Sequence, residues 1–138
     1  MKISAIIPTF NEEEHISEAI KSVSWADEII VVDSFSNDNT IEIAKKLGVK
    51  IIQREYQYSA SQKNWAIPQA EHNWVFLLDA DERVSNALKE EILNWKKINP
   101  KYQSYWIYRT NHFMGKKIKY SGWQLSLIHI SEPTRRGI

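Results

Sequence analysis

The stretch EIIVVDSFSNDNTIEIAKKLG, residues 28–48, decides the fold expected for this chain. It opens with a nearly continuous apolar run at residues 28–33, which is typical of a strand buried on both faces of a parallel sheet. Polar turn residues follow, and residues 39–47 then carry apolar side chains at helical spacing, with Gly48 as a natural helix stop. This strand–turn–helix unit predicts an α/β fold.

The same alternation of apolar runs and helical patterns extends along most of the chain. Further strands are expected at residues 3–8, 50–52 and 74–79, with an aromatic-rich edge or turning strand at 105–109. Helices are expected at residues 12–23, 59–69 and 86–98, the last one capped by Ser85. Strand–helix alternation with short links predicts an open, mostly parallel, Rossmann-like sheet flanked by helices on both faces.

Composition narrows the class of function. The 138 residues fit one domain, and 18 basic against 17 acidic side chains leave a net charge of only +1. Such a balance provides no basic field for a polyanion, so we expect no nucleic-acid partner. The chain contains no cysteine, which excludes disulfides and thiolate metal sites. We expect no signal peptide and no membrane span, because no apolar stretch approaches the roughly 20 residues that a span requires.

Polar residues follow the expected strands, where ligands bind in open parallel sheets. Asp79-Ala80-Asp81 comes directly after the fourth apolar run, and two carboxylates one residue apart can share a hard divalent cation such as Mg²⁺ or Mn²⁺. That chemistry suits the departure of a diphosphate. The alternative is that Asp81 or Ser85 merely caps the following helix.

Other polar positions allow two interpretations each. Asp33 ends the second strand, where an acid accepts hydrogen bonds from a ribose or base, but it also suits a turn. Asp38-x-Thr40 favours a helix cap, and the acid run at residues 12–14 mostly complements a helix dipole. Lys63 is placed to reach a phosphate, although a lone lysine is usually a solvated surface charge.

Four motifs in this order resemble a known family. They are IIPTFNEE at residues 6–13, EIIVVDSFSNDNT at 28–40, SQKNWAI at 61–67 and WVFLLDADER at 74–83. Together they are similar to the family 2 inverting glycosyltransferases of GT-A fold, and especially to bacterial enzymes that add a β-linked hexose to the lipopolysaccharide inner core. The likeness extends over residues 3–124, so it covers most of the chain.

The resemblance implies a nucleotide-sugar site with a divalent cation. The uridine or ribose would contact Asp33, and Asp81, with Asp79, would hold Mg²⁺ or Mn²⁺ in the D-x-D motif. The remaining nucleotide-sugar-binding positions implied by the family are Pro8, Thr9, Asn11, Glu12, Lys63, Asn64, Asp79 and Ala80.

The same resemblance implies hexosyl transfer from a UDP-sugar donor, with inversion, to a lipopolysaccharide or other lipid-linked saccharide acceptor. Such an enzyme would be cytoplasmic, held by peripheral contacts at the inner face of the cytoplasmic membrane. One alternative is a non-catalytic nucleotide-sugar-binding fragment that lacks the acceptor-side base. A second is a haloacid-dehalogenase-like phosphatase, which the position of the D-x-D motif on the fourth strand disfavours.

The likeness ends after the segment Gly122-Trp123-Gln124. We therefore expect residues 1–124 to be the N-terminal part of a GT-A domain, and residues 125–138 to be an atypical tail. The general base that would deprotonate the acceptor hydroxyl is unassigned, since Glu132 is the sole carboxylate in that tail. The segment LIHISEPTR, residues 127–135, resembles translated adapter or vector sequence.

A foreign tail predicts a break in the gene after the codon for residue 124. Resequencing the source locus should show native coding sequence that diverges from this chain beyond that point. A continuous native reading frame through Ile138 would contradict the hypothesis.

Overall fold

A computed structural model describes residues 2–57, 59–72 and 74–97, together with four later strands within residues 104–129. Side chains are described up to residue 97, except those at positions 59, 60, 63 and 95. In these ranges no helix is long and apolar enough to cross a bilayer.

The described strands form one six-stranded sheet and a small separate pair. The sheet order is β3-β2-β1-β4-β8-β5, in which β1 to β4 are mutually parallel while β8 runs antiparallel to both of its neighbours. The bounds are β1 Ile3–Thr9, β2 Glu28–Asp33, β3 Lys50–Gln53, β4 Trp74–Leu77, β5 Ser104–Tyr108 and β8 Gln124–His129. The separate pair consists of β6, His112–Phe113, and β7, Lys116–Lys117. The prediction of an open, mostly parallel sheet is confirmed, and β5 forms one edge of it.

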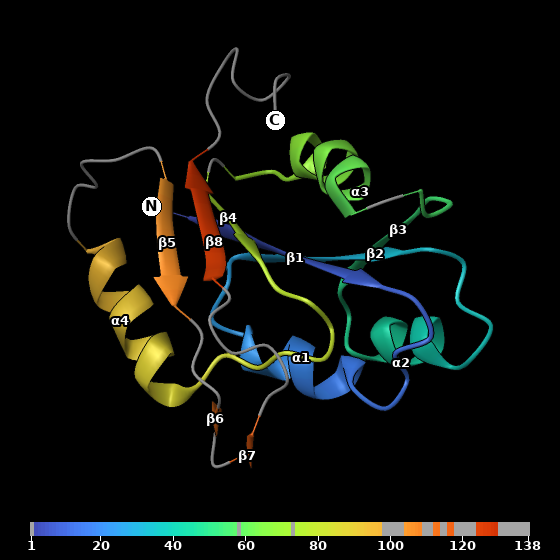
Figure 1. The fold of residues 1–138 in the computed structure, drawn as a ribbon, viewed down its shortest axis with the longest axis horizontal. Coiled ribbons are helices and arrows are strands. Elements are labelled where there is room, and N and C mark those ends of the chain that lie inside the picture. Colours follow the sequence, from blue (N-terminus) through green and yellow to red (C-terminus); the bar gives the residue numbers. More distant parts are fainter. Residues whose placement is uncertain are drawn as a thin grey trace.

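The helices cover both faces of the sheet, as Figure 1 shows for α3 on one side and α1 and α2 on the other. Their bounds are α1 Ile16–Ser22, α2 Thr40–Lys46, α3 Ser59–Ala66 continuing into the 3₁₀ turn η1 Ile67–Gln69, and α4 Asn86–Lys96. At the start of α4 the Ser85 hydroxyl accepts a hydrogen bond from the Leu88 amide, at 3.1 Å. The predicted Ser85 cap is therefore confirmed.

Two hydrophobic cores lie on opposite faces of the sheet because successive strand residues point in opposite directions. One core packs Ile7, Val31 and Phe76 of the strands against side chains of α1, α2 and α4. The other packs strand residues such as Ile6 and Val32 against α3 and η1. Burial on both faces explains why the strand sequences are continuously apolar rather than alternating.

The first helix is shorter than its pattern predicted. The sequence indicated a helix over residues 12–23, but α1 begins at Ile16. The preceding residues form a turn in which the Glu12 carbonyl accepts hydrogen bonds from the His15 and Ile16 amides, at 2.9 and 2.8 Å. The amides of Glu12 and Glu13 are bonded to side chains of the next βα loop. Contacts between loops, which periodicity does not encode, thus delay the start of the helix.

The strand β8 was not identified from the sequence. It pairs with β4 through residues 126–129 and with β5 through residues 124–128, so it separates these two strands. Backbone hydrogen bonds make these pairings, and many apolar sequences can form them. The domain boundary at residue 124 and the origin of residues 125–138 therefore stay predictions.

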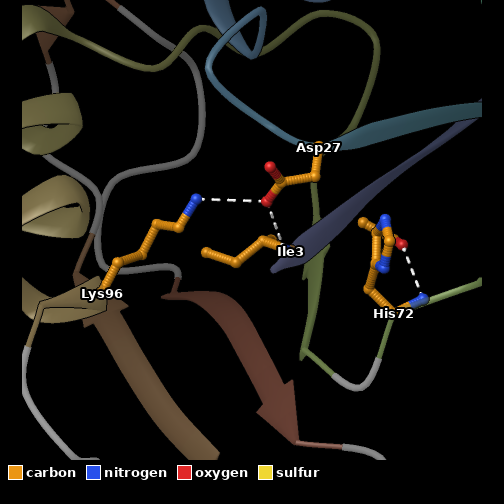
Figure 2. A network of polar contacts seen from close by, with 5 residues as sticks. Ile3, Asp27, His72 and Lys96 are labelled. Carbon is orange, nitrogen blue, oxygen red and sulfur yellow. Dashed lines mark hydrogen bonds and ion pairs between the residues drawn. The ribbon is translucent and has the colours of Figure 1, made fainter. Parts of the chain in front are cut away.

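An ion pair joins the last turn of α4 to the amino end of the sheet (Figure 2). The Asp27 carboxylate accepts hydrogen bonds from the Ile3 amide at 2.9 Å and from the Lys96 ammonium at 3.1 Å. Desolvation acts to raise the pKa of Asp27, but these two hydrogen bonds and the nearby positive charge outweigh it, so the pKa lies below its ordinary value. Asp27 thus anchors α4 beside the start of β1.

Replacing Asp27 by Asn should lower the free energy of unfolding by about 0.5–1.5 kcal/mol at neutral pH, because the charge-assisted contact with Lys96 is lost. A depressed folded-state pKa means that the contribution is complete above about pH 4 and disappears as the pH falls through the folded value. Urea denaturation at pH 7 and at pH 3 should therefore show a difference from wild type that shrinks at low pH. The exposed-site variant Glu42→Gln is the control, and a pH-independent difference at Asp27 would contradict the assignment.

Candidate functional site

The carboxyl ends of β1, β2 and β3 meet at one edge of the sheet. Thr9 of β1 lies opposite Asp33 of β2, which lies opposite Gln53 of β3. Beyond these residues the Ser34 amide donates to the Thr9 carbonyl and the Arg54 amide to the Asp33 carbonyl, both at 3.0 Å. The predicted positions Thr9 and Asp33 are thus brought together.

Asp33 is fully buried and is the centre of this edge. One carboxylate oxygen accepts hydrogen bonds from the Thr9 hydroxyl, at 3.1 Å, and from the Ser36 hydroxyl. The other accepts from the Ser36 amide at 2.8 Å and from the Gln53 side-chain amide at 3.3 Å. The interpretation of Asp33 as a turn former is confirmed, while its contact with a nucleoside stays a prediction.

Two loops, β1–α1 and β2–α2, are joined by reciprocal hydrogen bonds. The Asn11 amide donates to the Ser36 hydroxyl at 2.8 Å, and the Asn37 amide donates back to the Asn11 side-chain oxygen at 2.7 Å. The Glu12 amide donates to the Thr40 hydroxyl at 2.9 Å. The predicted residues Asn11 and Glu12 therefore lie in a loop whose backbone is held by its neighbour.

Asp38 extends this network at the start of α2. Its carboxylate accepts hydrogen bonds from the Thr40 amide at 3.0 Å, from the Thr40 hydroxyl and from the Glu13 amide at 3.2 Å. Desolvation acts to raise the pKa of Asp38, but these hydrogen bonds outweigh it and hold the pKa below its ordinary value. Asp38 thus bonds the first residue of α2, whereas the N-cap residue itself is Asn39, which makes no side-chain cap hydrogen bond. The Glu13 carboxylate, by contrast, accepts a hydrogen bond from the Asn39 amide. It therefore bonds the start of α2 rather than the start of α1, which follows it in the sequence.

Each of the two loops contains a residue with positive φ, Asn11 at 51° and Phe35 at 61°. Asparagine tolerates this left-handed region, but a bulky aromatic residue there is an outlier that costs about 1–2 kcal/mol. The Phe35 side chain is also 54% exposed, so packing recovers only part of that cost.

Three further predicted nucleotide-binding residues lie on β1 and α3, namely Pro8, Lys63 and Asn64. Pro8 is half-buried near the end of β1. Asn64 is exposed on α3, while the side chain of Lys63 lies outside the described residues. The neighbouring Gln62 is buried and donates to the Ser34 hydroxyl at 3.0 Å, which ties α3 to the β2–α2 loop.

The D-x-D motif lies in a tight turn after β4. The Glu82 amide donates to the Asp79 carbonyl at 2.9 Å, and the Glu82 carboxylate accepts from the Asp79 amide at 2.8 Å. The Arg83 guanidinium folds back onto the Ala80 and Glu82 carbonyls, at 2.8 and 2.6 Å. Glu82 is fully buried, so the turn is built around a buried acid.

The two aspartates of this turn suit a divalent cation whose remaining ligands come from elsewhere, such as substrate phosphates. Ser85 caps α4, which removes the helix-cap explanation for Asp81. Both aspartates are half-buried, whereas the Ala80 methyl group packs in the core. The part of the chain that the structure describes has no group of three or more potential metal ligands. A carboxylate pair completed by substrate phosphates is a usual Mg²⁺ arrangement, so the donor set fits such an ion.

Sequence inspection missed the residues that hold the site together. Glu82, Gln62, Gln53 and Ser36 all bond to site residues or their loops. Among these residues, Glu82 could have been recognised from the sequence because it is adjacent to the D-x-D motif. Its burial could not be predicted, because a polar side chain is normally expected on the surface.

Comparison with known proteins identifies the family of this chain. The profile of glycosyl transferase family 2 matches residues 4–135 of this chain. The chain belongs to glycosyl transferase family 2. The match takes in residues 125–135, part of the segment predicted to be an atypical tail.

The family 2 relatives are longer than the matching segment. An uncharacterized glycosyltransferase of Rickettsia typhi is 46% identical over 92 residues, which cover 66% of this chain and 32% of the relative. The lipopolysaccharide core biosynthesis glycosyltransferase LpsC of Rhizobium meliloti is 31% identical over 111 residues, covering 70% of this chain and 41% of the relative. The chain thus spans about a third of the length of the first curated relatives it matches.

A solved structure agrees with the family 2 fold. Glucosyl-3-phosphoglycerate synthase of Mycobacterium tuberculosis, in complex with Mn²⁺, UDP and glucosyl-3-phosphoglycerate, superposes with a TM-score of 0.63 at 25% identity. The superposition covers 75% of this chain and 42% of the synthase. The GT-A-like fold predicted from the four motifs is confirmed.

Replacing Glu82 by Leu should lower the free energy of unfolding by about 1–3 kcal/mol, because the Asp79 amide loses its acceptor inside the protein. Glu82→Gln retains an acceptor oxygen and should cost less. Urea denaturation of both variants checks this expectation, with Glu90→Leu on the exposed face of α4 as the matched control. Wild-type stability of Glu82→Leu would show that the carboxylate does not hold the turn.

Proposed function

We propose that this chain binds the nucleotide-sugar donor of a hexosyltransferase, a UDP-sugar, together with Mg²⁺ or Mn²⁺. The observation that carries the proposal is the turn after β4 that contains Asp79 and Asp81. The buried Glu82 bonds the Asp79 amide there, and β4 lies beside β1 in the sheet. Ligands of open α/β sheets bind at this edge. The resemblance of residues 74–83 to the D-x-D motif of family 2 implies that this pair of carboxylates would serve the donor.

The donor would lie along the edge in the order of the strands. Asp79 and Asp81 would hold the cation and, through it, the diphosphate, while the β1–β2 edge would receive the nucleoside at Thr9, Asn11 and Asp33. When bound, the cation neutralises the charge that develops on the departing diphosphate. The hydrogen bonds between the two βα loops would keep the nucleoside side of the site preorganised.

One of the structural comparisons supports a divalent cation and a uridine nucleotide as the ligands. The synthase structure whose fold resembles this chain contains both Mn²⁺ and UDP. The proposal therefore includes a requirement for Mg²⁺ or Mn²⁺ and the choice of a uridine nucleotide as donor.

For the whole protein we propose transfer of the hexose, with inversion, to a lipopolysaccharide or other lipid-linked saccharide acceptor. The name of the Rhizobium relative, a core biosynthesis glycosyltransferase, supports such an acceptor. Inversion requires a base that deprotonates the acceptor hydroxyl opposite the departing diphosphate. No described residue is assigned that role, and Glu132 lies outside the described residues.

Such an acceptor would situate the protein in the cytoplasm, at the inner face of the cytoplasmic membrane. The 138-residue chain itself can retain donor binding without transfer if the acceptor-side base lies elsewhere. This binding-only alternative shares every donor-site residue and differs only in the outcome of a transfer assay.

Titration calorimetry of UDP into the full chain, with and without Mn²⁺, tests the donor site. Binding should require the cation, and Asp81→Asn should weaken it by about ten- to a hundred-fold, since one of few cation ligands is lost. Glu90→Gln, which removes an exposed acid from α4, is the matched control and should bind like wild type. Folded protein that binds no UDP under either condition would refute the donor-site assignment.

A further inference from the structure

Three exposed aromatic side chains follow the ends of three neighbouring strands. Phe10 comes directly after β1, Phe35 two residues after β2 and Tyr56 three residues after β3, and they are 52%, 54% and 56% exposed. These strands are adjacent in the sheet, in the order β3-β2-β1. The large aromatic residues that the described part of the chain exposes therefore lie on the loops of one sheet edge.

Phe35 is the member of this row that the fold itself least explains. Its backbone has a φ of 61°, a left-handed conformation that aromatic residues rarely adopt. Glycine would adopt the same conformation without a clash. Since the ring is half exposed as well, neither backbone geometry nor packing accounts for an aromatic residue at this position.

The surrounding turn holds the Phe35 backbone in this conformation. Asp33 accepts hydrogen bonds from both the amide and the hydroxyl of Ser36, which closes the turn around Phe35. The Ser34 hydroxyl is held from the other side by Gln62 of α3, at 3.0 Å. The Ser36 hydroxyl in turn accepts from the Asn11 amide, so Phe35 lies beside the β1–α1 loop that carries Phe10. The strained residue is therefore fixed next to the edge assigned to the nucleoside.

We propose that Phe35 is a donor-contacting residue whose ring stacks on the pyrimidine base of the nucleotide. This inference rests on the proposed function, because it uses the cation and diphosphate at the end of β4 as a reference point. Neighbouring strands lie about 4.8 Å apart, and β2 is two strands from β4, so the β2–α2 loop is about 10 Å from the D-x-D turn along the edge. A diphosphate bound at β4 thus directs the ribose across β1 and the base toward Phe35.

A strained backbone and an exposed ring, as at Phe35, persist where a bound ligand packs against the ring. Backbone strain of this kind is concentrated at binding sites, where the surrounding structure enforces it. A flat aromatic ring is the side chain that stacks on a base regardless of hydrogen-bonding pattern. In the absence of donor the ring remains half exposed, and the base would cover it.

Calorimetry on the whole 138-residue chain with Mn²⁺ distinguishes a stacking ring from a generic apolar contact. Phe35→Leu keeps the apolar bulk without the ring and should weaken UDP binding by about five- to a hundred-fold, the range expected for one base–aromatic stack. Phe35→Tyr keeps the ring and should bind UDP within about threefold of wild type, well short of the loss of a stack. Leu47→Ala, at the half-exposed end of α2, is the control and should not change the affinity.

Inorganic pyrophosphate with Mn²⁺ separates the base from the phosphates. Phe35→Leu should bind pyrophosphate like wild type, whereas Asp81→Asn should bind both UDP and pyrophosphate more weakly. Equal UDP affinity of Phe35→Leu and wild type, or equal losses in the Leu and Tyr variants, would overturn the stacking role alone. Loss of pyrophosphate binding in Phe35→Leu would also overturn it. A wild-type chain that binds neither UDP nor pyrophosphate would overturn the proposed function and this inference together.

Phe35→Gly supplies a readout that a structural role would not produce. Removing the strained side chain should leave the melting temperature at or above that of the wild-type chain while UDP binding weakens as in the Leu variant. A lower melting temperature with unchanged UDP affinity would assign Phe35 to folding and overturn the inference.

Discussion

The buried carboxylate of Asp33 is the contact on which the candidate site depends. It accepts hydrogen bonds from Thr9 of β1, from Gln53 of β3 and from Ser36 of its own loop. A buried carboxylate is stable only when its oxygens are satisfied in this way. The ends of three strands are therefore held in one arrangement, and the loops that follow them start from defined positions.

The two βα loops then hold each other through backbone amides. The Asn11 amide donates to the Ser36 hydroxyl and the Asn37 amide donates to the Asn11 side-chain oxygen, while the Glu12 and Glu13 amides use Thr40 and Asp38 as acceptors. Polar turn residues often bond within their own loop, but here many of them bond between loops. Binding a nucleotide to such an edge requires little further ordering of the chain, which lowers the entropic cost of association.

The backbone of the D-x-D turn is also held by hydrogen bonds, but these are made within the turn rather than between loops. The central residue of the turn is the fully buried Glu82, whose carboxylate accepts a hydrogen bond from the Asp79 amide. Arg83 satisfies carbonyls of the same turn. With the backbone bonded within the turn and α4 capped by Ser85, the positions of Asp79 and Asp81 are set by residues that need not contact a ligand. The two proposed cation ligands therefore lie in a turn whose backbone is held from within.

Sequence alone determined the layered α/β fold and the sheet edge at which the candidate site residues gather. Continuous apolar runs such as residues 28–33 cannot be satisfied except between two covered faces, and parallel strands necessarily bring their carboxyl ends to one edge. Only the tertiary structure decided which polar residues are buried, because Asp33, Gln62 and Glu82 are as polar as their exposed neighbours. It also decided the late start of α1 and the insertion of β8 between β4 and β5, since both depend on hydrogen bonds between segments distant in the chain. Local propensity indicates which secondary structure a segment prefers, whereas hydrogen-bond and packing partners from other segments determine which one it adopts.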